Sequence, residues 1–279
     1  MRVANYEYAE QIGQGAFGTI YKGRNMKTGE AVVVKTEPQD APFSTLKHES
    51  TIMNLLYSKS CRNIPPTYWY GLSDAGHRVF VMPFYEETLE TLLLKTEDVR
   101  VFCNVMRSAI LILKSVHDKY VVHRDIKPAN WMIRRNELVL IDFGLAAFYV
   151  DAEERHIEPS KKTHIIGSPK WASWNVHCGE EYSRRDDLLS VLYIGMFCLE
   201  KRGLFSASAF QQIQGSDDAA LDHPRNLWLK LQKTLEFVSK KTEKWSALKQ
   251  FADKVYNLSF QERPSYDEYA KLFVTDDYR

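Results

Sequence analysis

The stretch His123-Arg124-Asp125-Ile126-Lys127-Pro128-Ala129-Asn130 is followed, twelve residues after Asn130, by Asp142-Phe143-Gly144. Phosphoryl transfer needs a base that orients the attacking hydroxyl, cations that hold the phosphates, and oxygen ligands that hold those cations. Asp125 is the candidate base, Lys127 the candidate contact to the transferred group, and Asn130 and Asp142 are the candidate metal ligands. The alternative is a loop and a hairpin that match by chance, and the ordered spacing of both segments argues against it.

The composition is that of an ordinary soluble globular protein. The chain has 279 residues, of which 44% are hydrophobic and 26% charged, enough for one large domain or two small lobes. Lys and Arg total 37, against 36 for Asp and Glu, so no charge excess indicates a nucleic-acid or membrane partner. The net charge itself decides nothing about such partners, and we predict no nucleic-acid partner and no membrane association.

The cysteines and the apolar runs predict an intracellular protein. The four cysteines, Cys61, Cys103, Cys178 and Cys198, are far apart and form no CxxC pair, which favours reduced thiols. No apolar run approaches the roughly 20 residues that a membrane span needs, and the N-terminus has no apolar signal core. We expect a cytoplasmic and/or nuclear location.

Gly13, Gly15 and Gly18 lie between two predicted strands, residues 5–12 and 19–24. A glycine motif that binds dinucleotides opens a helix, whereas a strand follows here, so the dinucleotide interpretation does not meet its structural condition. Glycine has no side chain to keep phosphates away from the backbone amides. The three glycines are therefore predicted to contact the phosphates of a nucleotide.

Lys35 ends a predicted apolar strand, residues 31–35, and lies 17 residues after Gly18. Alone, such a lysine is more often a surface residue. After the glycine loop, its position fits a lysine that pairs with the α- and β-phosphates of ATP. Glu49 lies 14 residues further on, in a predicted helix at residues 44–56, and is expected to hold Lys35 in an ion pair rather than to be exposed.

The remaining pattern divides the chain into a strand-rich half and a helix-rich half. Strands are predicted at residues 67–72 and 78–84, followed by helices near 88–95, 97–116, 245–258 and 266–273 and a hairpin at 131–133 and 138–141. The hairpin is expected to bring Asn130 and Asp142 to the same side of a ligand cleft between the halves. We therefore predict an α+β chain with residues 1–82, 83–85 and 86–279 as small lobe, hinge and large lobe.

The hinge is expected to meet the adenine of a nucleotide through its backbone. Pro83 has no N–H group, so the amide of Tyr85 is the expected donor. Apolar side chains expected around the adenine are those of Ile12, Ile20, Val33, Met82 and Met132. Plain core packing is the alternative for these residues, and the two uses are compatible.

This ordered set of residues resembles the eukaryotic protein kinase family across essentially the whole chain. The resemblance implies a bilobal fold, with a small antiparallel five-stranded lobe carrying one long helix and a larger, mainly helical lobe. It also implies ATP and Mg²⁺, with Mn²⁺ as an alternative, and protein substrates. Lys127, two residues after the base, is the serine/threonine pattern, so Ser and Thr hydroxyls are the expected acceptors.

Two segments resemble the casein kinase I group: Ser173-Trp174-Asn175, where most kinases have Ala-Pro-Glu, and Ser183-Arg184-Arg185-Asp186-Asp187-Leu188. The resemblance implies a monomer that phosphorylates acidic or already phosphorylated segments. Ser168 is expected to bridge Asp125 and Lys127, with a turn serine as the alternative. Lys170 stands where the group often has an arginine for a priming phosphate, and lysine lacks its bidentate fork. Asp187 is expected to tether the catalytic loop.

The chain also departs from the casein kinase I pattern. Residues 201–244 show no match to the group's substrate-binding insert, and Glu86 replaces the glycine after the hinge. Residues 145–167 are the expected activation segment, in which Ser160 and Thr163 are candidate phosphorylation sites near Arg124. A solvated loop without such a role is favoured for them.

Two other classes of function compete with an active serine/threonine kinase. A pseudokinase that binds partners through its surface is disfavoured, because every expected catalytic position is filled. A small-molecule kinase is disfavoured by residues 167–188, which resemble a peptide-facing segment.

Overall fold

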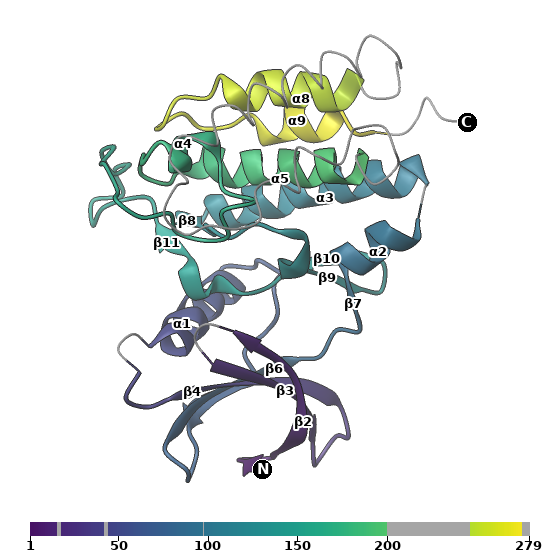
Figure 1. Cartoon of the computed structure of the whole chain (residues 1–279), viewed down its shortest axis with the longest axis vertical. Helices are drawn as coiled ribbons and strands as arrows, with labels where there is room; N and C mark the ends of the chain where they lie inside the picture. The colour runs from purple at the N-terminus through teal and green to yellow at the C-terminus, as the bar shows by residue number, and fades with distance from the viewer. Residues whose placement is uncertain (16–17, 42–43, 97, 200–245, 275–279) are drawn as a thin grey trace. The chain divides into compact units, whose positions relative to one another are not determined.

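The computed structural model describes residues 1–15, 18–41, 44–96, 98–199 and 246–274. The predictions on residues 201–244 lie outside these ranges. The chain forms two compact units, one of Met1–Glu87 with Met132–Ala146 and one of Thr88–Trp131 with Ala147–Arg279 (Figure 1). We call them the N-terminal unit and the C-terminal unit.

The N-terminal unit is built on one antiparallel sheet with strand order β1-β2-β3-β4-β6-β5. Its strands are β1 (Arg2–Val3), β2 (Tyr6–Gly15), β3 (Gly18–Asn25), β4 (Ala31–Pro38), β5 (Trp69–Leu72) and β6 (His77–Pro83). The five predicted strands are all present. The prediction of a five-stranded sheet is nevertheless wrong by one strand, because the two-residue β1 is too short to show a period of two in the sequence.

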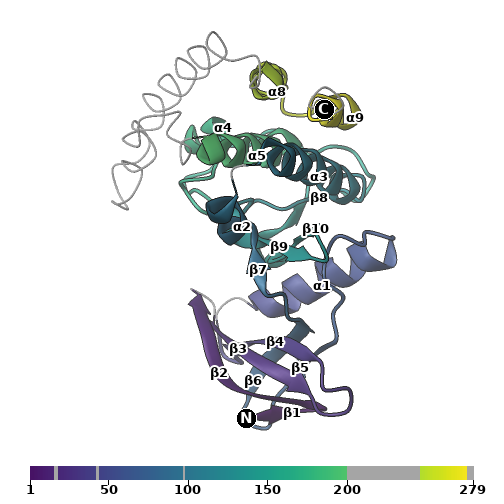
Figure 2. The ribbon, with the colours of Figure 1, turned by 90° about the vertical axis from the view of Figure 1, so that its right-hand side faces the viewer.

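Alternation along β4 gives the sheet two different faces. Val32 and Val34 are fully buried in an apolar cluster with Val79 and Val81 of β6. The side chains of Val33, Lys35 and Glu37 point to the opposite face, because successive strand residues alternate. Helix α1 (Thr45–Ser58) packs against β4 and β6 beside this sheet and buries the apolar side chains of Leu46, Ile52, Met53 and Leu56 (Figure 2).

A hairpin from later in the sequence belongs to the N-terminal unit. Strands β9 (Trp131–Arg134) and β10 (Glu137–Leu140) are joined at Arg135 and Asn136, both with positive φ, as tight hairpin turns require. Asn63 holds the hairpin, because its Nδ2 donates to the Leu138 carbonyl and its own carbonyl accepts from the Leu140 N–H. The 3₁₀ helix η2 (Phe143–Leu145) then packs on α1. The structure thus groups residues 132–146 with the N-terminal unit, whereas the sequence analysis placed them in the larger lobe.

The C-terminal unit is mainly helical. Its elements are α2 (Leu89–Lys95), α3 (Val99–His117), β8 (Val121–Val122), η1 (Pro128–Asn130), β11 (Ala147–Phe148), α4 (Trp174–His177), α5 (Arg184–Leu199), α8 (Ser246–Tyr256) and α9 (Tyr266–Lys271). Strand β7 (Glu87–Thr88) lies at the junction of the two units. Helix α3 begins after Asp98, whose carboxylate accepts from the Arg100 N–H as an N-cap. It packs against α5 and α9, and α5 packs against α8 (Figures 1 and 2).

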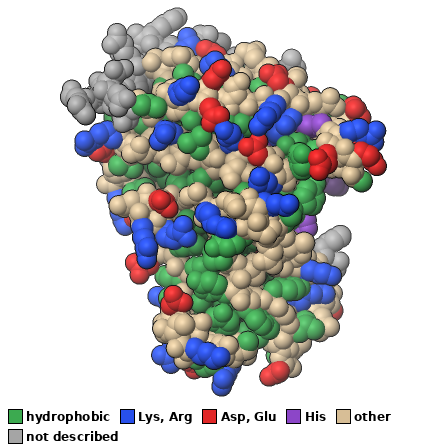
Figure 3. Space-filling model, turned by 180° about the vertical axis from the view of Figure 1, so that it is seen from behind, with side chains coloured by type: hydrophobic (Ala, Val, Ile, Leu, Met, Phe, Trp, Pro, Cys, Tyr) green, Lys and Arg blue, Asp and Glu red, His purple; other side chains and the backbone are tan. Residues whose placement is uncertain are grey.

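The four cysteines, all within the described ranges, are thiols and not disulfides. Within the ranges described above, no helix is both long enough and apolar enough to cross a membrane. Basic and acidic side chains are interspersed on the face drawn in Figure 3.

Candidate active site

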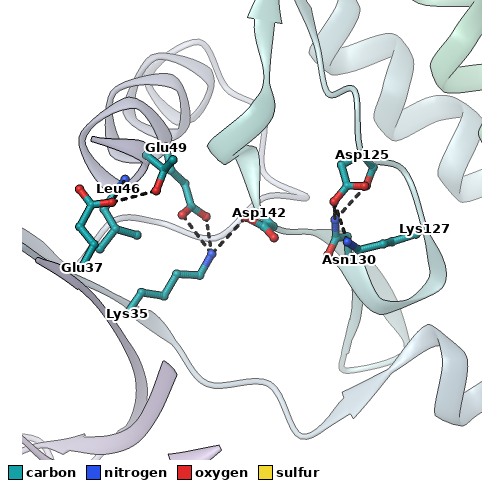
Figure 4. Close-up of polar contacts among 9 residues, drawn as sticks. Lys35, Glu37, Leu46, Glu49, Asp125, Lys127, Asn130 and Asp142 are labelled. Carbon is teal, nitrogen blue, oxygen red and sulfur yellow. Dashed lines mark hydrogen bonds and ion pairs between the residues drawn. The ribbon is translucent and has the colours of Figure 1, made fainter. Parts of the chain in front are cut away.

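Lys35 of β4 is held by carboxylates within the N-terminal unit (Figure 4). Its Nζ lies 2.7 Å from Oε1 and 3.0 Å from Oε2 of Glu49, and 3.4 Å from Oδ1 of Asp142. The side chains of Lys35 and Glu49 are 11% and 2% exposed, whereas that of Asp142 is 44% exposed. Burial alone would lower the pKa of Lys35, but the charges of Asp142 and Glu49 outweigh burial and raise it. The ammonium therefore stays charged.

Asp142 is presented by a strained turn. Its backbone has φ 70° and ψ 67°, in the left-handed region that few side chains adopt. The next residue, Phe143, is fully buried in the segment that packs on α1. His48 of α1 fastens the end of this turn, because its Nε2–H donates to the Ala146 carbonyl over 2.7 Å. Helix α1 therefore positions both Glu49 and the Asp142 turn.

Asp125 lies in a hydrogen-bond network within the C-terminal unit (Figure 4). Its Oδ2 accepts from Lys127 Nζ at 2.7 Å and from Asn130 Nδ2 at 3.1 Å. Its Oδ1 accepts from the Ser168 N–H at 2.9 Å. Lys127 Nζ also donates to Ser168 Oγ at 3.0 Å, which is the bridge expected of Ser168. These bonds fix the orientation of the Asp125 carboxylate, which is 8% exposed.

The amide of Asn130 is oriented by the same network. Its Nδ2 donates to the Asp125 carbonyl at 2.8 Å as well as to the carboxylate. Oδ1 is then the amide atom left to bind a cation. Mg²⁺ prefers carboxylate and carbonyl oxygens, so Asn130 in one unit and the half-exposed Asp142 in the other are each suitable ligands. The residues present fit the metal that the sequence predicts.

Asp187 of α5 holds the segment around His123 and Arg124 by its backbone. The N–H groups of His123 and Arg124 donate to its two carboxylate oxygens at 2.8 and 3.0 Å. His117 Nε2 lies 2.9 Å from Oδ2, and its Nδ1 is paired with the Tyr266 hydroxyl. Burial opposes ionisation of Asp187, but the bond and charge of His117 and the His123 N–H outweigh it and lower its pKa. Sequence reasoning found Asp187 and missed His117, which no local motif marks.

Two residues at the start of α4, Ser173 and Asn175, bond the Asp186 side chain of α5. Ser173 caps α4 by accepting from the Val176 N–H, and its Oγ–H donates to Asp186. Asn175 Nδ2 donates to the same carboxylate oxygen at 3.2 Å. Asp186 is fully buried, and burial raises its pKa. The serine and asparagine of this motif thus satisfy a buried carboxylate that sequence reasoning did not connect with them.

The expected activation segment, residues 145–167, is held by Glu181. Ser160 Oγ donates to Glu181 Oε2 at 2.6 Å, and Lys162 Nζ lies 2.6 Å from the same oxygen. The Ser160 hydroxyl is therefore engaged rather than merely solvated, whereas Thr163 is exposed. Phosphorylation of either residue stays a prediction.

The residues expected around adenine all lie in the N-terminal unit. Val33 and Met82 are buried opposite each other in neighbouring strands, Ile20 and Met132 are half-buried, and Ile12 is 44% exposed. The Phe84 N–H donates to the Ala31 carbonyl at 3.3 Å, which agrees with Tyr85 as the expected donor to adenine. Burial raises the pKa of the Tyr85 hydroxyl to about 12. Contact of these residues with adenine stays a prediction.

The glycine loop continues the β2–β3 ladder as far as the pair Gly15 and Gly18. A Cβ atom on Gly18 would lie 2.0 Å from the Thr36 carbonyl oxygen. Gly18 is thus required by the close approach of β4, independently of any phosphate. A Cβ on Gly13 would lie 3.6 Å from Ile20, an ordinary contact, so no packing constraint requires a glycine there.

Lys170 contacts two aromatic rings. Its Nζ lies 5.3 Å from the Trp171 ring centroid and 5.1 Å from the Phe197 ring centroid, within the range of cation–π attraction. A role in binding a priming phosphate stays a prediction.

Comparisons with known proteins show which proteins this chain is similar to. The protein kinase domain model matches residues 6–273. Casein kinase I homolog 1 of Schizosaccharomyces pombe is 32% identical over 205 residues, which are 70% of this chain and 45% of that protein. The chain thus spans less than half the length of this relative.

Proposed function

This chain belongs to the protein kinase family, and on that premise we propose that it is a serine/threonine kinase of casein kinase I type. It transfers the γ-phosphoryl group of ATP to Ser and Thr hydroxyls of proteins. The observation that carries the proposal is the Asp125 carboxylate, whose oxygens are oriented by Lys127, Asn130 and the Ser168 N–H. A base held in this way can accept the proton of an incoming hydroxyl.

Lys127 has a second part in the proposal. Its ammonium is 26% exposed and bonds both Asp125 and Ser168. A cation at this position stabilises the negative charge of the phosphoryl group as it moves toward the acceptor oxygen. Lysine at this position is also the reason for proposing Ser and Thr as acceptors.

ATP would be held by the N-terminal unit. The amides of Gly13, Gly15 and Gly18 and the ammonium of Lys35 would bind its phosphates, and Glu49 keeps Lys35 in place. Asn130 and Asp142 would hold Mg²⁺, or Mn²⁺ in its stead. When bound, the metal neutralises charge on the phosphates. The apolar residues named above would enclose the adenine.

The substrates are proposed to be acidic or already phosphorylated protein segments, as the similarity to a casein kinase I homolog suggests. Lys170 would contribute to that preference through its charge. We further propose that the protein acts as a monomer inside the cell, in the cytoplasm and/or nucleus, with its cysteines reduced.

A degenerate Ser, Thr and Tyr peptide library, with and without priming phosphates, tests this function. With Mg²⁺ and ATP, the wild type is expected to phosphorylate Ser and Thr peptides, and Asp142→Asn is expected to abolish the activity. A thermal shift by ATP with and without Mg²⁺ separates nucleotide binding from transfer. Binding without transfer to any peptide would favour a pseudokinase, and modification of Tyr peptides alone would contradict the acceptor class.

A further inference from the structure

Glu37 of β4 is fully buried, although its side chain ends in a carboxyl group. Its Oε1 accepts from Ser44 Oγ at 2.9 Å, and its Oε2 accepts from Thr45 Oγ1 at 2.8 Å and from the Leu46 N–H at 3.1 Å. Figure 4 shows Glu37 pointing at the first turn of α1. A buried carboxylate is costly unless it is well paired, so these bonds must be of structural value.

The helix that donates these bonds, α1, has no side-chain cap from its own N-cap residue. Ser44 occupies the N-cap position of α1 but makes no side-chain cap bond, and the first turn contains no acidic residue. The first N–H groups of a helix need acceptors, and its N-terminus favours a negative charge. Glu37 supplies the acceptor and the acidic group from the neighbouring strand β4. It therefore acts as an N-terminal cap of α1 although it belongs to the sheet.

Glu37 lies two residues after Lys35 on the same strand, so both side chains point to the face on which α1 packs. Lys35 binds Glu49, and Glu37 binds the Leu46 N–H one turn earlier in the same helix. Strand β4 thus contacts α1 through two side chains, the basic Lys35 and the acidic Glu37. Arg78 of β6 lies opposite Glu37 of β4 in the sheet. Its Nη1 lies 3.6 Å from Glu37 Oε1, which places a positive charge beside the buried carboxyl group.

We propose that Glu37 is a positioning residue for phosphoryl transfer, which fixes the start of α1 and so holds Glu49 at Lys35. This inference rests on the proposed kinase function for its catalytic consequence. Its structural part does not, because the contacts from Glu37 to α1 exist whatever the reaction.

The first arm of the test measures the helix directly. Hydrogen exchange of the α1 amides is compared between wild type, Glu37→Gln and Val79→Ala. Val79 is buried on the other face of the same sheet, away from α1, so Val79→Ala controls for general loss of stability. Glu37→Gln is expected to increase exchange in α1 relative to β2 and β3, which contain neither substituted residue, whereas Val79→Ala is expected to leave that ratio unchanged. An unchanged ratio in Glu37→Gln overturns the proposal.

The second arm measures the reaction. Glu37→Gln is expected to lower kcat about 10- to 100-fold with little change in the peptide KM, because a small displacement of a positioned group is costly to the rate. Glu49→Gln is the second single variant. If Glu37 acts through Glu49, the double variant should have the kcat of Glu49→Gln alone. Effects that multiply in the double variant contradict the proposal.

A milder variant serves if Glu37→Gln does not fold. Thr45→Val removes one of the three donors and leaves the carboxylate in place, so a smaller change in α1 exchange and kcat is expected. Wild-type protein that transfers phosphate to no substrate would refute the kinase function, while the α1 exchange ratio would still decide the role of Glu37.

Discussion

Lys35 and Glu49 form a buried ion pair in which Nζ of the lysine lies 2.7 Å from Oε1 of the glutamate. The more exposed carboxylate of Asp142 lies on the same ammonium at 3.4 Å. Helix α1 and the Asp142 turn of the N-terminal unit therefore each place a carboxylate beside the Lys35 ammonium of strand β4. This contact among three side chains explains why the spacing of Lys35, Glu49 and Asp142 along the sequence matters.

Lys35→Met should abolish phosphoryl transfer and leave the protein folded. The substitution removes the cation proposed to bind the ATP phosphates, while Glu49 can take up a proton once its partner is lost. Steady-state transfer to casein and circular dichroism check the two parts. Lys27→Met, in an exposed turn, is the control and should behave as wild type. Full activity in Lys35→Met would remove Lys35 from the proposed site.

Gly167→Ala should impair catalysis far more than Gly29→Ala. Both glycines have positive φ, 90° and 77°, so each substitution strains the backbone by a comparable amount. A Cβ on Gly167 would lie 2.2 Å from the Arg124 carbonyl oxygen, whereas nothing lies within 4 Å at Gly29. The clash should move the Ser168 N–H away from Asp125. Measured kcat should fall for Gly167→Ala alone, and equal effects would show that the Ser168 bond is unimportant.

Ser173→Ala should destabilise the fold by about 2 kcal/mol, because it removes a donor to the buried Asp186 carboxylate and a helix cap together. Urea unfolding measures the change. Ser58→Ala is the matched control, since Ser58 is exposed and its hydroxyl bonds the Leu55 carbonyl of the same helix, and its effect should stay within about 0.5 kcal/mol. Equal stabilities of the two variants would mean that Ser173 does not support Asp186.

Acidification should weaken the fold partly through His177. Burial lowers the pKa of this imidazole, and the bond to the Pro169 carbonyl offsets burial only in part. The folded state then binds fewer protons than the unfolded chain, so the contribution of His177 is present above about pH 6.5 and is lost as the pH falls. The fall in Tm from about pH 7.5 to 5.5 should be smaller in His177→Gln than in wild type. His164→Gln, at an exposed site, should not change it, and an unaltered fall in His177→Gln would contradict the assignment.

Local patterns in the sequence predicted the main elements of the fold. The protein kinase family and its α+β fold are confirmed, and the ion pair expected from the spacing of Lys35 and Glu49 is present in the structure. These features repeat with short periods or fixed spacings, which one sequence can reveal. The roles assigned to Asp125 and the other site residues stay predictions.

The contacts that the sequence did not reveal join residues of different elements of the fold, which no local pattern connects. His117 meets Asp187 across 70 positions, and Ser173 at the N-cap of α4 meets Asp186 in the first turn of α5. Glu37 lies two residues beyond the end of the predicted strand at residues 31–35, and its partners are the first residues of α1. Its spacing of two from Lys35, on the same face of β4, was the one signal that could have identified it.

The most direct test of the central claim is transfer of the γ-phosphate of ATP to casein, with Mg²⁺, by wild type and by Asp125→Asn. Asparagine keeps the shape of the side chain and removes the base, so the fold should persist. The account predicts transfer to Ser and Thr by the wild type and loss of transfer in Asp125→Asn, on the order of 10²- to 10⁴-fold. Equal rates for the two proteins would contradict it.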